Sequence, residues 1–300
     1  MQNPFADLKS FFRSKNILAK LIIINVVVWL GIMFLEVLFN LFNSSFADLI
    51  VQWLAVPASF SKLMTRPWTL FTYMFLHLEF WHILFNMMWL FWFGRIFLEY
   101  LSERQLLATY ILGGLAGALF YVISFNIFPK FQDIYVLSIA LGASASVMAI
   151  VVAISYYVPN YSINLLFLGP VKIIYIAIFS IVLDILMIRS ENAGGHLAHI
   201  GGAIWGFYYI YRLKKGTDFS LLFAKFSWKN FTRPFMRPKK TKFKNVYTNP
   251  RAKSDEDYNL HKKQNQEKID AILDKISRSG YESLSKQEKE LLFKSSNNNK

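Results

Sequence analysis

Residues 142–157 read GASASVMAIVVAISYY, an apolar run in which small side chains recur every four residues. The same spacing returns in residues 196–211, which read HLAHIGGAIWGFYYIY. Side chains four residues apart lie on one face of a helix. The two small-residue stripes are Ala145, Ala149 and Ala153 in the first run and Ala198, Gly202 and Gly206 in the second. Because such stripes let helices approach closely in lipid, the two runs are predicted to pack against each other.

Composition places these runs in a membrane protein. Hydrophobic residues make up 54% of the 300 residues, the mean hydropathy is +0.32 and only 17% are charged, which is too apolar for an ordinary soluble domain and excludes a disordered chain. A bilayer core about 30 Å thick needs about 20 apolar residues for each helical crossing. The segments that meet this need are 18–38, 79–99, 105–126, 136–157, 170–188 and 196–211, with 67–77 as an interfacial approach to the second. We therefore expect an all-α membrane protein with six transmembrane helices.

The distribution of Lys and Arg predicts the orientation of these helices. With the N-terminus inside, 29 of the 33 Lys and Arg residues fall on the inner side and four on the outer side, as the positive-inside rule requires. We expect a multi-pass protein with both termini in the cytoplasm and an uncleaved first span. The expected regions are a cytoplasmic N-terminus (1–17), the six-span domain (18–211), a basic linker (212–253) and a small helical module (254–300).

The linker carries most of the net charge of +14. Residues 212–253 hold 13 Lys and Arg residues and one acid, Asp218. Basic residues near a membrane surface attract anionic lipid headgroups by about 1 kcal/mol each. The same charge can bind nucleic acid, but positive-inside topology explains it without such a partner. We therefore expect contact with membrane lipids and no nucleic-acid partner, and we make no prediction about oligomers.

The end of the chain has the pattern of two short helices. A helical repeat of apolar residues is followed by a glycine that breaks it, then by a capping box and a second apolar cluster. These features are Ile269, Ile272, Leu273 and Ile276, then Gly280, then Ser285 with Glu288, then Leu291, Leu292 and Phe293.

Polar side chains gather at the outer end of the predicted spans. Burying a polar side chain in lipid costs free energy, so each of them is a candidate functional residue. The close packing of the two stripes brings Ser144 within reach of His199, and a serine needs an adjacent base to become a nucleophile. His82 and Asn86 lie at i and i+4 on one helix face near the same end. Together with the Ser144 backbone N–H they can donate hydrogen bonds to an oxyanion.

The other residues near this cluster are expected to have structural roles. Gly142 permits a close approach of the backbone, and His196 is expected in the loop before the sixth span. Asp184 is expected deep in the fifth span, away from His199, so we predict a Ser–His dyad without a third member. Ser146 points away from Ser144 around the helix and is expected only to pack. The chain has no Cys, and we expect no cofactor and no metal.

Three motifs together resemble the rhomboid family of intramembrane serine proteases over about residues 17–212. They are His77-x4-His82-x3-Asn86, Gly142-x-Ser144 and Ala198-His199-x-x-Gly202. The resemblance implies a six-span rhomboid-like bundle with Ser144 as nucleophile and His199 as general base. It implies His82 and Asn86 at the oxyanion, a supporting role for His77, and hydrolysis of peptide bonds in or next to transmembrane helices of protein substrates. The six-span core resembles the basic bacterial form of the family, which implies a bacterial inner membrane, and residues 269–294 also resemble the tail of some bacterial rhomboids.

The sequence departs from the family pattern in three places. Ala145 follows the serine where many members have glycine, and Met148 replaces an aromatic residue that stacks on the catalytic histidine. The Trp-Arg pair of many first outer loops is missing from 39–66. Two other functions remain open beside the protease: a catalytically weak or inactive rhomboid-like binder of transmembrane helices, and a transporter that uses the histidines and Asp184.

Overall fold

The structure, a computed structural model, describes residues 16–165, 169–190, 192–223 and 255–290. The chain divides into two compact units, Met1–Phe231 and Thr232–Lys300. Most of the predicted basic linker, from residue 224 to residue 253, lies outside the described residues.

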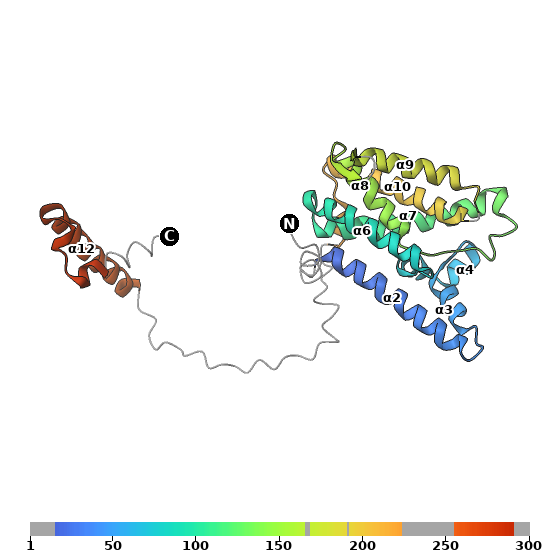
Figure 1. Ribbon diagram of the computed structural model, residues 1–300, viewed down its shortest axis with the longest axis horizontal. Helices are drawn as coiled ribbons and strands as arrows, with labels where there is room; N and C mark the ends of the chain where they lie inside the picture. The colour runs from blue at the N-terminus through green and yellow to red at the C-terminus, as the bar shows by residue number, and fades with distance from the viewer. Residues whose placement is uncertain (1–15, 166–168, 191, 224–254, 291–300) are drawn as a thin grey trace. The chain divides into compact units, whose positions relative to one another are not determined.

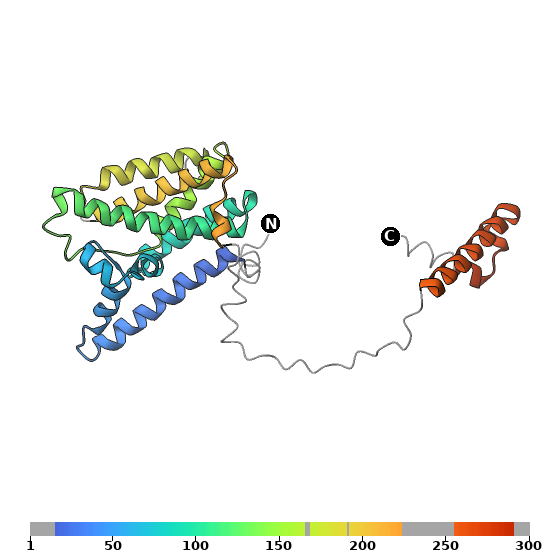
Figure 2. The same ribbon diagram turned by 180° about the vertical axis from the view of Figure 1, so that it is seen from behind.

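The first unit is mainly helical, with two small antiparallel pairs of strands, β1–β2 and β3–β4. Its elements in chain order are α2 (Ile17–Asn40), α3 (Phe46–Leu54), β1 (Val56–Pro57), α4 (Phe60–Thr65), α5 (Thr69–Thr72), η1 (Tyr73–Phe75), α6 (Phe80–Tyr100), α7 (Glu103–Ile127), η2 (Pro129–Phe131), β2 (Ile139–Ala140), α8 (Ser144–Tyr157), β3 (Ser162–Leu165), β4 (Gly169–Lys172), α9 (Ile173–Met187), α10 (Ala193–Lys214) and η3 (Phe219–Phe223). In both ribbon views α6 to α10 run side by side, while α2 lies at an angle to them with α3 and α4 near its far end (Figures 1 and 2).

Each of the six predicted apolar segments overlaps one of the long helices α2, α6, α7, α8, α9 and α10. By length and composition, α2 and α7 are long and apolar enough to cross a bilayer. The apolar helices α8 and α9 have only 14 and 15 residues, and α6 and α10 carry charged or polar side chains. The number of six spans therefore stays a prediction.

Helix α8 begins later than the sequence suggested, at Ser144 instead of residue 136. Residues 139–140 pair with Val56 and Pro57 as a two-stranded ladder, and Gly142 has a φ of +120°, which a helix cannot accommodate. These two features keep residues 139–142 out of the helix, so the helix can begin only after them. The serine therefore stands at the N-terminus of a helix.

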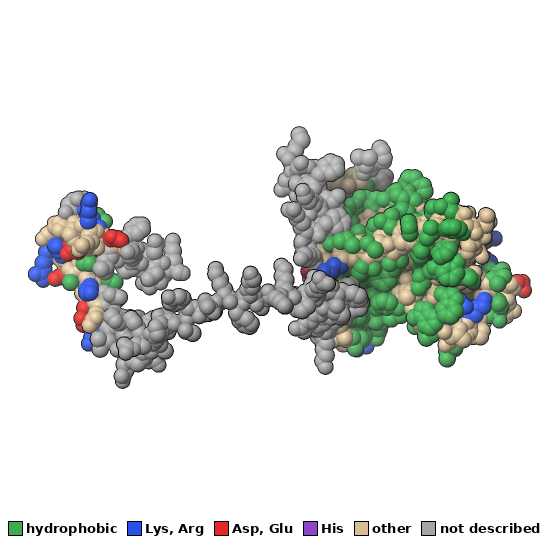
Figure 3. Space-filling model, turned by 90° about the horizontal axis from the view of Figure 1, so that it is seen from below, with side chains coloured by type: hydrophobic (Ala, Val, Ile, Leu, Met, Phe, Trp, Pro, Cys, Tyr) green, Lys and Arg blue, Asp and Glu red, His purple; other side chains and the backbone are tan. Residues whose placement is uncertain are grey.

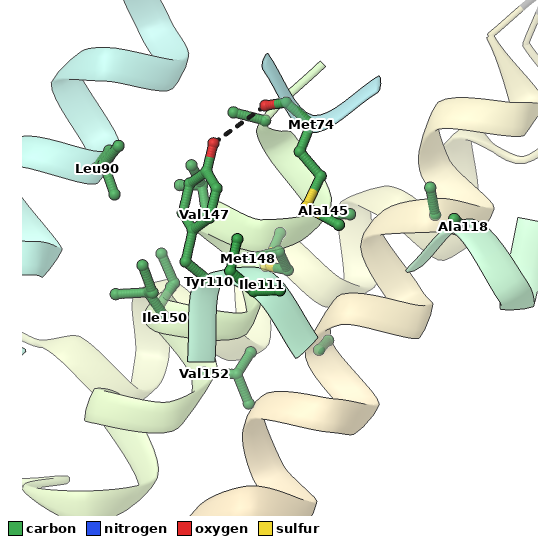
Figure 4. Packing of buried hydrophobic residues seen from close by; sticks show 14 of the residues in the cluster. Met74, Leu90, Tyr110, Ile111, Ala118, Ala145, Val147, Met148, Ile150 and Val152 are labelled. Carbon is green, nitrogen blue, oxygen red and sulfur yellow. Dashed lines mark hydrogen bonds between the residues drawn. The ribbon is translucent and has the colours of Figure 1, made fainter. Parts of the chain in front are cut away.

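The predicted packing of the two small-residue stripes is confirmed. A Cβ atom added at Gly202 would overlap the carbonyl oxygen of Ala145, and one at Gly206 would overlap that of Ala149. Since both contacts advance by four residues, α8 and α10 run parallel at their closest approach. Helix α7 packs on the same residues through Gly117. Within the buried core, the Tyr110 hydroxyl donates to the Met74 carbonyl at 3.0 Å (Figure 4).

The outside of the first unit is strongly apolar, and a broad hydrophobic face is visible in Figure 3. Exposed side chains include Phe34 on α2, Trp81 on α6 and Phe179 on α9, with 67%, 65% and 62% of their surface accessible. Soluble monomers rarely expose contiguous apolar surface on this scale. The surface is that of a protein whose helices face lipid.

The second unit contains α12 (Asp255–Ser279), η4 (Tyr281–Ser283) and a helical turn at 286–290. Gly280 has a φ of +75° at the end of α12. The predicted capping box is confirmed, because the Ser285 N–H donates to Glu288 Oε2 at 2.6 Å and the Glu288 N–H donates to Ser285 Oγ at 3.3 Å. Lys275 reaches back to the Glu288 carboxylate at 3.0 Å. The predicted cluster Leu291–Phe293 lies outside the described residues.

Candidate functional site

A cavity of about 860 Å³ opens among α6, α8, α9 and α10. Of the residues predicted to form the catalytic and oxyanion site, His77 does not line the cavity, and the others do, namely His82, Asn86, Gly142, Ser144 and His199. Met148, which replaces the family's aromatic residue, lines the same cavity. The fold thus collects residues from three distant segments around one space.

The backbone before Ser144 is held by two hydrogen bonds. The Gly142 N–H donates to the Tyr73 carbonyl at 2.9 Å, and the Ala143 N–H donates to Nε2 of His77 at 3.3 Å. His77 is fully buried and is absent from the lining of the cavity. Its imidazole therefore fixes the turn that presents the serine. Because the first N–H groups of a helix have no acceptor within it, Ser144 also brings unpaired backbone donors to the cavity.

His82 lies close to the Ser144 side chain. A Cβ atom added at Gly142 would lie 2.9 Å from the Cε1 and Nε2 atoms of His82 and 3.7 Å from Ser144 Oγ. Only a glycine therefore leaves room for the His82 ring at this point. Asn86 is buried, and its Nδ2 donates to the carbonyl oxygen of His82 one turn earlier, at 2.9 Å.

His199 is held by a carboxylate, which contradicts the expectation that Asp184 lies away from it. Nδ1 of His199 and Nδ1 of His196 each lie 2.8 Å from the same oxygen, Oδ1 of Asp184. Asp184 is 6% exposed. His196 is also not a loop residue, because α10 begins at Ala193 and places both histidines, three residues apart, on one face. The signal for this contact was present, since a carboxylate within an apolar run needs a partner.

The structure brings the candidate nucleophile, Ser144, and the candidate base, His199, to one cavity. Within the described part of the chain, it forms no hydrogen bond between Ser144 Oγ and His199. Catalytic hydrogen bonds are often long before substrate binds. The site therefore holds a hydroxyl at a helix N-terminus, a carboxylate-bound imidazole, and two further donors in His82 and Asn86. Groups of these kinds can serve acyl transfer.

Comparison with known proteins agrees with the resemblance. Residues 64–216 match the family described as Rhomboid domain, and residues 253–298 match a family of unknown function, DUF6576. The chain is 34% identical over 160 residues to RHOMBOID-like protein 12, mitochondrial, of Arabidopsis thaliana, which covers 50% of this chain and 48% of that protein. It is 29% identical over 154 residues to Rhomboid protein 1, mitochondrial, of Saccharomyces cerevisiae, covering 48% and 41%.

These similarities extend over part of each protein. The chain spans about half the length, or less, of the curated relatives that it matches. Both relatives are mitochondrial by name, so they give no support to the prediction of a bacterial inner membrane.

Proposed function

This chain belongs to the rhomboid family, and we propose that it is a serine protease that hydrolyses peptide bonds in or next to transmembrane helices of protein substrates. The observation that carries the proposal is the cavity that Ser144 shares with a His199 held by Asp184. Nucleophilic catalysis requires a hydroxyl and an oriented imidazole base, whereas helix packing alone requires neither.

In the proposed reaction, Ser144 Oγ attacks the carbonyl carbon of the scissile bond and His199 Nε2 takes the hydroxyl proton. The oxyanion that forms accepts hydrogen bonds from the Ser144 backbone N–H, the His82 imidazole and the Asn86 amide. His199 then gives its proton to the leaving amine, and an acyl-enzyme remains. A water molecule attacks this ester with His199 again as base, and the carboxylic acid and the free serine are released.

Asp184 acts in this scheme as a positioning residue. Its Oδ1 accepts a hydrogen bond from Nδ1–H of His199 at 2.8 Å. A neutral imidazole with its proton on Nδ1 has its lone pair on Nε2, the atom that must receive the serine proton. The carboxylate also stabilises the imidazolium formed in each step. We therefore extend the predicted Ser–His dyad by a third member.

The proposal keeps the predicted placement in the membrane. Six spans with both termini on the inner side put the cavity toward the outer side, where water can enter. The basic segment 212–253 then lies next to the inner headgroups and can contact anionic lipids. The substrate is a transmembrane protein whose helix reaches the cavity.

The alternative is a rhomboid-like protein that binds transmembrane helices without cleaving them. The missing hydrogen bond between Ser144 and His199 and the presence of Ala145 and Met148 favour it. The two functions are separated by incubating the purified protein with a fluorophosphonate probe and with a transmembrane test substrate. A protease is labelled at Ser144 and cleaves the substrate. A binder is not labelled and retains the substrate intact.

A further inference from the structure

Three metal-ligating atoms converge on one wall of the cavity. They are Oδ1 of Asp184, Nδ1 of His196 and Nδ1 of His199, and all lie within 4.8 Å of one another. We propose that these residues form a binding site for Zn²⁺, and that the bound ion switches off the protease. The binding site stands on geometry alone, whereas the inhibition rests on the proposed function.

The donor set fits zinc. Two imidazole nitrogens and one carboxylate oxygen are a common set of three protein ligands, which leaves a fourth position for water. All three residues line the cavity, so an ion can enter from it and the fourth position can face it. Tetrahedral bonds of about 2.0–2.1 Å place ligand atoms about 3.4 Å apart. The two Nδ1–Oδ1 separations of 2.8 Å therefore need to open only slightly, within reach of side-chain rotation.

The helices hold the ligands in a fixed relation. His196 and His199 are one turn apart on α10, and Asp184 comes from the neighbouring helix α9. Asp184 is buried and each histidine side chain is about one-fifth exposed, at 19% and 21%. Two neutral imidazoles and one carboxylate give the site a net negative charge, which suits a divalent cation. The proposed catalysis gives His196 no role, and a metal site accounts for its position.

Metal binding and catalysis need opposite tautomers of His199. A metal at Nδ1 takes the lone pair of that nitrogen, so the proton of the neutral ring must lie on Nε2. An Nε2–H cannot accept the proton of Ser144. In the metal-free state the reverse holds, because Nδ1–H donates to Asp184 and Nε2 has the lone pair. The same imidazole therefore cannot serve as zinc ligand and general base at once.

The binding site is tested with Co²⁺, whose visible spectrum reports four-coordination and needs no enzymatic activity. The full-length protein is purified without a histidine tag, stripped with chelator and titrated with Co²⁺ in the Ser144→Ala background. We expect one equivalent to bind with a tetrahedral spectrum. His196→Asn and Asp184→Asn should lose the spectrum, and His261→Asn, which changes a histidine of the tail, should keep it. No spectrum in the parent protein, or the same spectrum in His196→Asn, overturns the site.

Inhibition is tested separately with Zn²⁺ and a transmembrane test substrate, each variant being compared with its own metal-free rate. We expect Zn²⁺ to stop cleavage by the wild type. The half-inhibitory concentration should rise about tenfold or more in His196→Asn, because loss of a residue that only orients a metal ligand already costs about 10–100-fold in affinity. Mg²⁺, which prefers oxygen ligands, should have no effect. Equal sensitivity of both proteins to Zn²⁺ overturns the switch. A protein that binds Co²⁺ but never cleaves refutes the proposed protease and leaves the metal site standing.

Discussion

Nδ1 of His199 lies 2.8 Å from Oδ1 of Asp184 on the neighbouring helix. The contact joins α9 to α10 at the level of the cavity and fixes one imidazole nitrogen, which leaves the other free for chemistry. His196 uses the same oxygen. Asp184 is therefore central both to the proposed catalysis and to the proposed metal site.

Replacing Asp184 by Asn removes the charge with little change in size. We expect kcat to fall by at least about 10²-fold with KM nearly unchanged, because a carboxylate that sets the histidine tautomer acts mainly on the chemical step. Ser180→Ala is the matched control, since Ser180 lies one turn earlier on α9, lines the same cavity and donates its hydroxyl to the Ile176 carbonyl. A wild-type rate in Asp184→Asn would leave Asp184 without a catalytic role.

Two serines of α8 provide a direct test of the nucleophile. Ser144→Ala should abolish both cleavage and fluorophosphonate labelling while the protein still purifies as a folded monodisperse species. Ser146→Ala should keep most of the activity, because Ser146 is buried against Gly114 of α7 and does not line the cavity. Activity in Ser144→Ala together with loss in Ser146→Ala would mean that the serine has been misassigned.

The close contact between α8 and α10 is tested by adding a single methyl group. Gly202→Ala places a Cβ on the Ala145 carbonyl oxygen, so the helices must separate, at a cost of about 1–3 kcal/mol. We expect a lower melting temperature and a large loss of cleavage, since Ser144 adjoins the contact. Gly31→Ala on α2 meets nothing within 4 Å and should be neutral or slightly stabilising. Equal melting temperatures for the two variants would refute the packing argument.

Local spacing was enough to predict much of the fold. The small-residue stripes at Ala145 and Gly202 indicated that α8 and α10 touch, because small residues at four-residue spacing let two helices approach closely in lipid. The capping box at Ser285 was likewise readable, since both of its hydrogen bonds lie within four residues. The start of α8 was not, because the strand pairing that ends before Ser144 depends on residues about 80 positions away.

The candidate site divides in the same way. Ser144, His82 and His199 could be chosen from motifs, but the partner of His199 could not, because Asp184 lies on another helix and its direction depends on the rotation of α9. The prediction that no Asp is placed to orient His199 was wrong. A buried carboxylate has to find a donor. The two histidines at the start of the next helix, His196 and His199, were candidates that the prediction did not use.

The capping box gives the tail a specific pH dependence. Hydrogen bonds from the Ser285 backbone, from Lys275 and from the Ser285 hydroxyl lower the pKa of Glu288 to about 2. A carboxylate with a lowered pKa stabilises the fold above its ordinary pKa of about 4.5 and loses this effect as the pH falls toward about 2. Amide exchange in 281–290, corrected for intrinsic rates, should therefore accelerate over this range. Glu288→Gln should remove the pH dependence, and an unchanged profile would refute the assignment.

Two truncations separate the tail from the membrane unit. Asp218 accepts hydrogen bonds from Gln105 at 3.1 Å, from the Tyr209 hydroxyl at 2.9 Å and from the Ser220 N–H at 2.8 Å, and so ties the end of α10 to the start of α7. A chain ending at residue 223 keeps these bonds, and we expect it to cleave a test substrate in detergent within about tenfold of the full chain, or about 1.4 kcal/mol in barrier. A chain ending at residue 214 loses them.

The shorter chain leaves the buried Tyr209 hydroxyl without its acceptor, at a cost of about 1–3 kcal/mol. It should therefore melt at a lower temperature than the chain ending at residue 223. Asp218→Ala in the full-length protein is the matched control and should reproduce this loss. If the chain ending at residue 223 is well folded but inactive in detergent, the tail takes part in the reaction or in its gating. If the two truncations melt together, Asp218 does not tie α10 to α7 in the way that the hydrogen bonds imply.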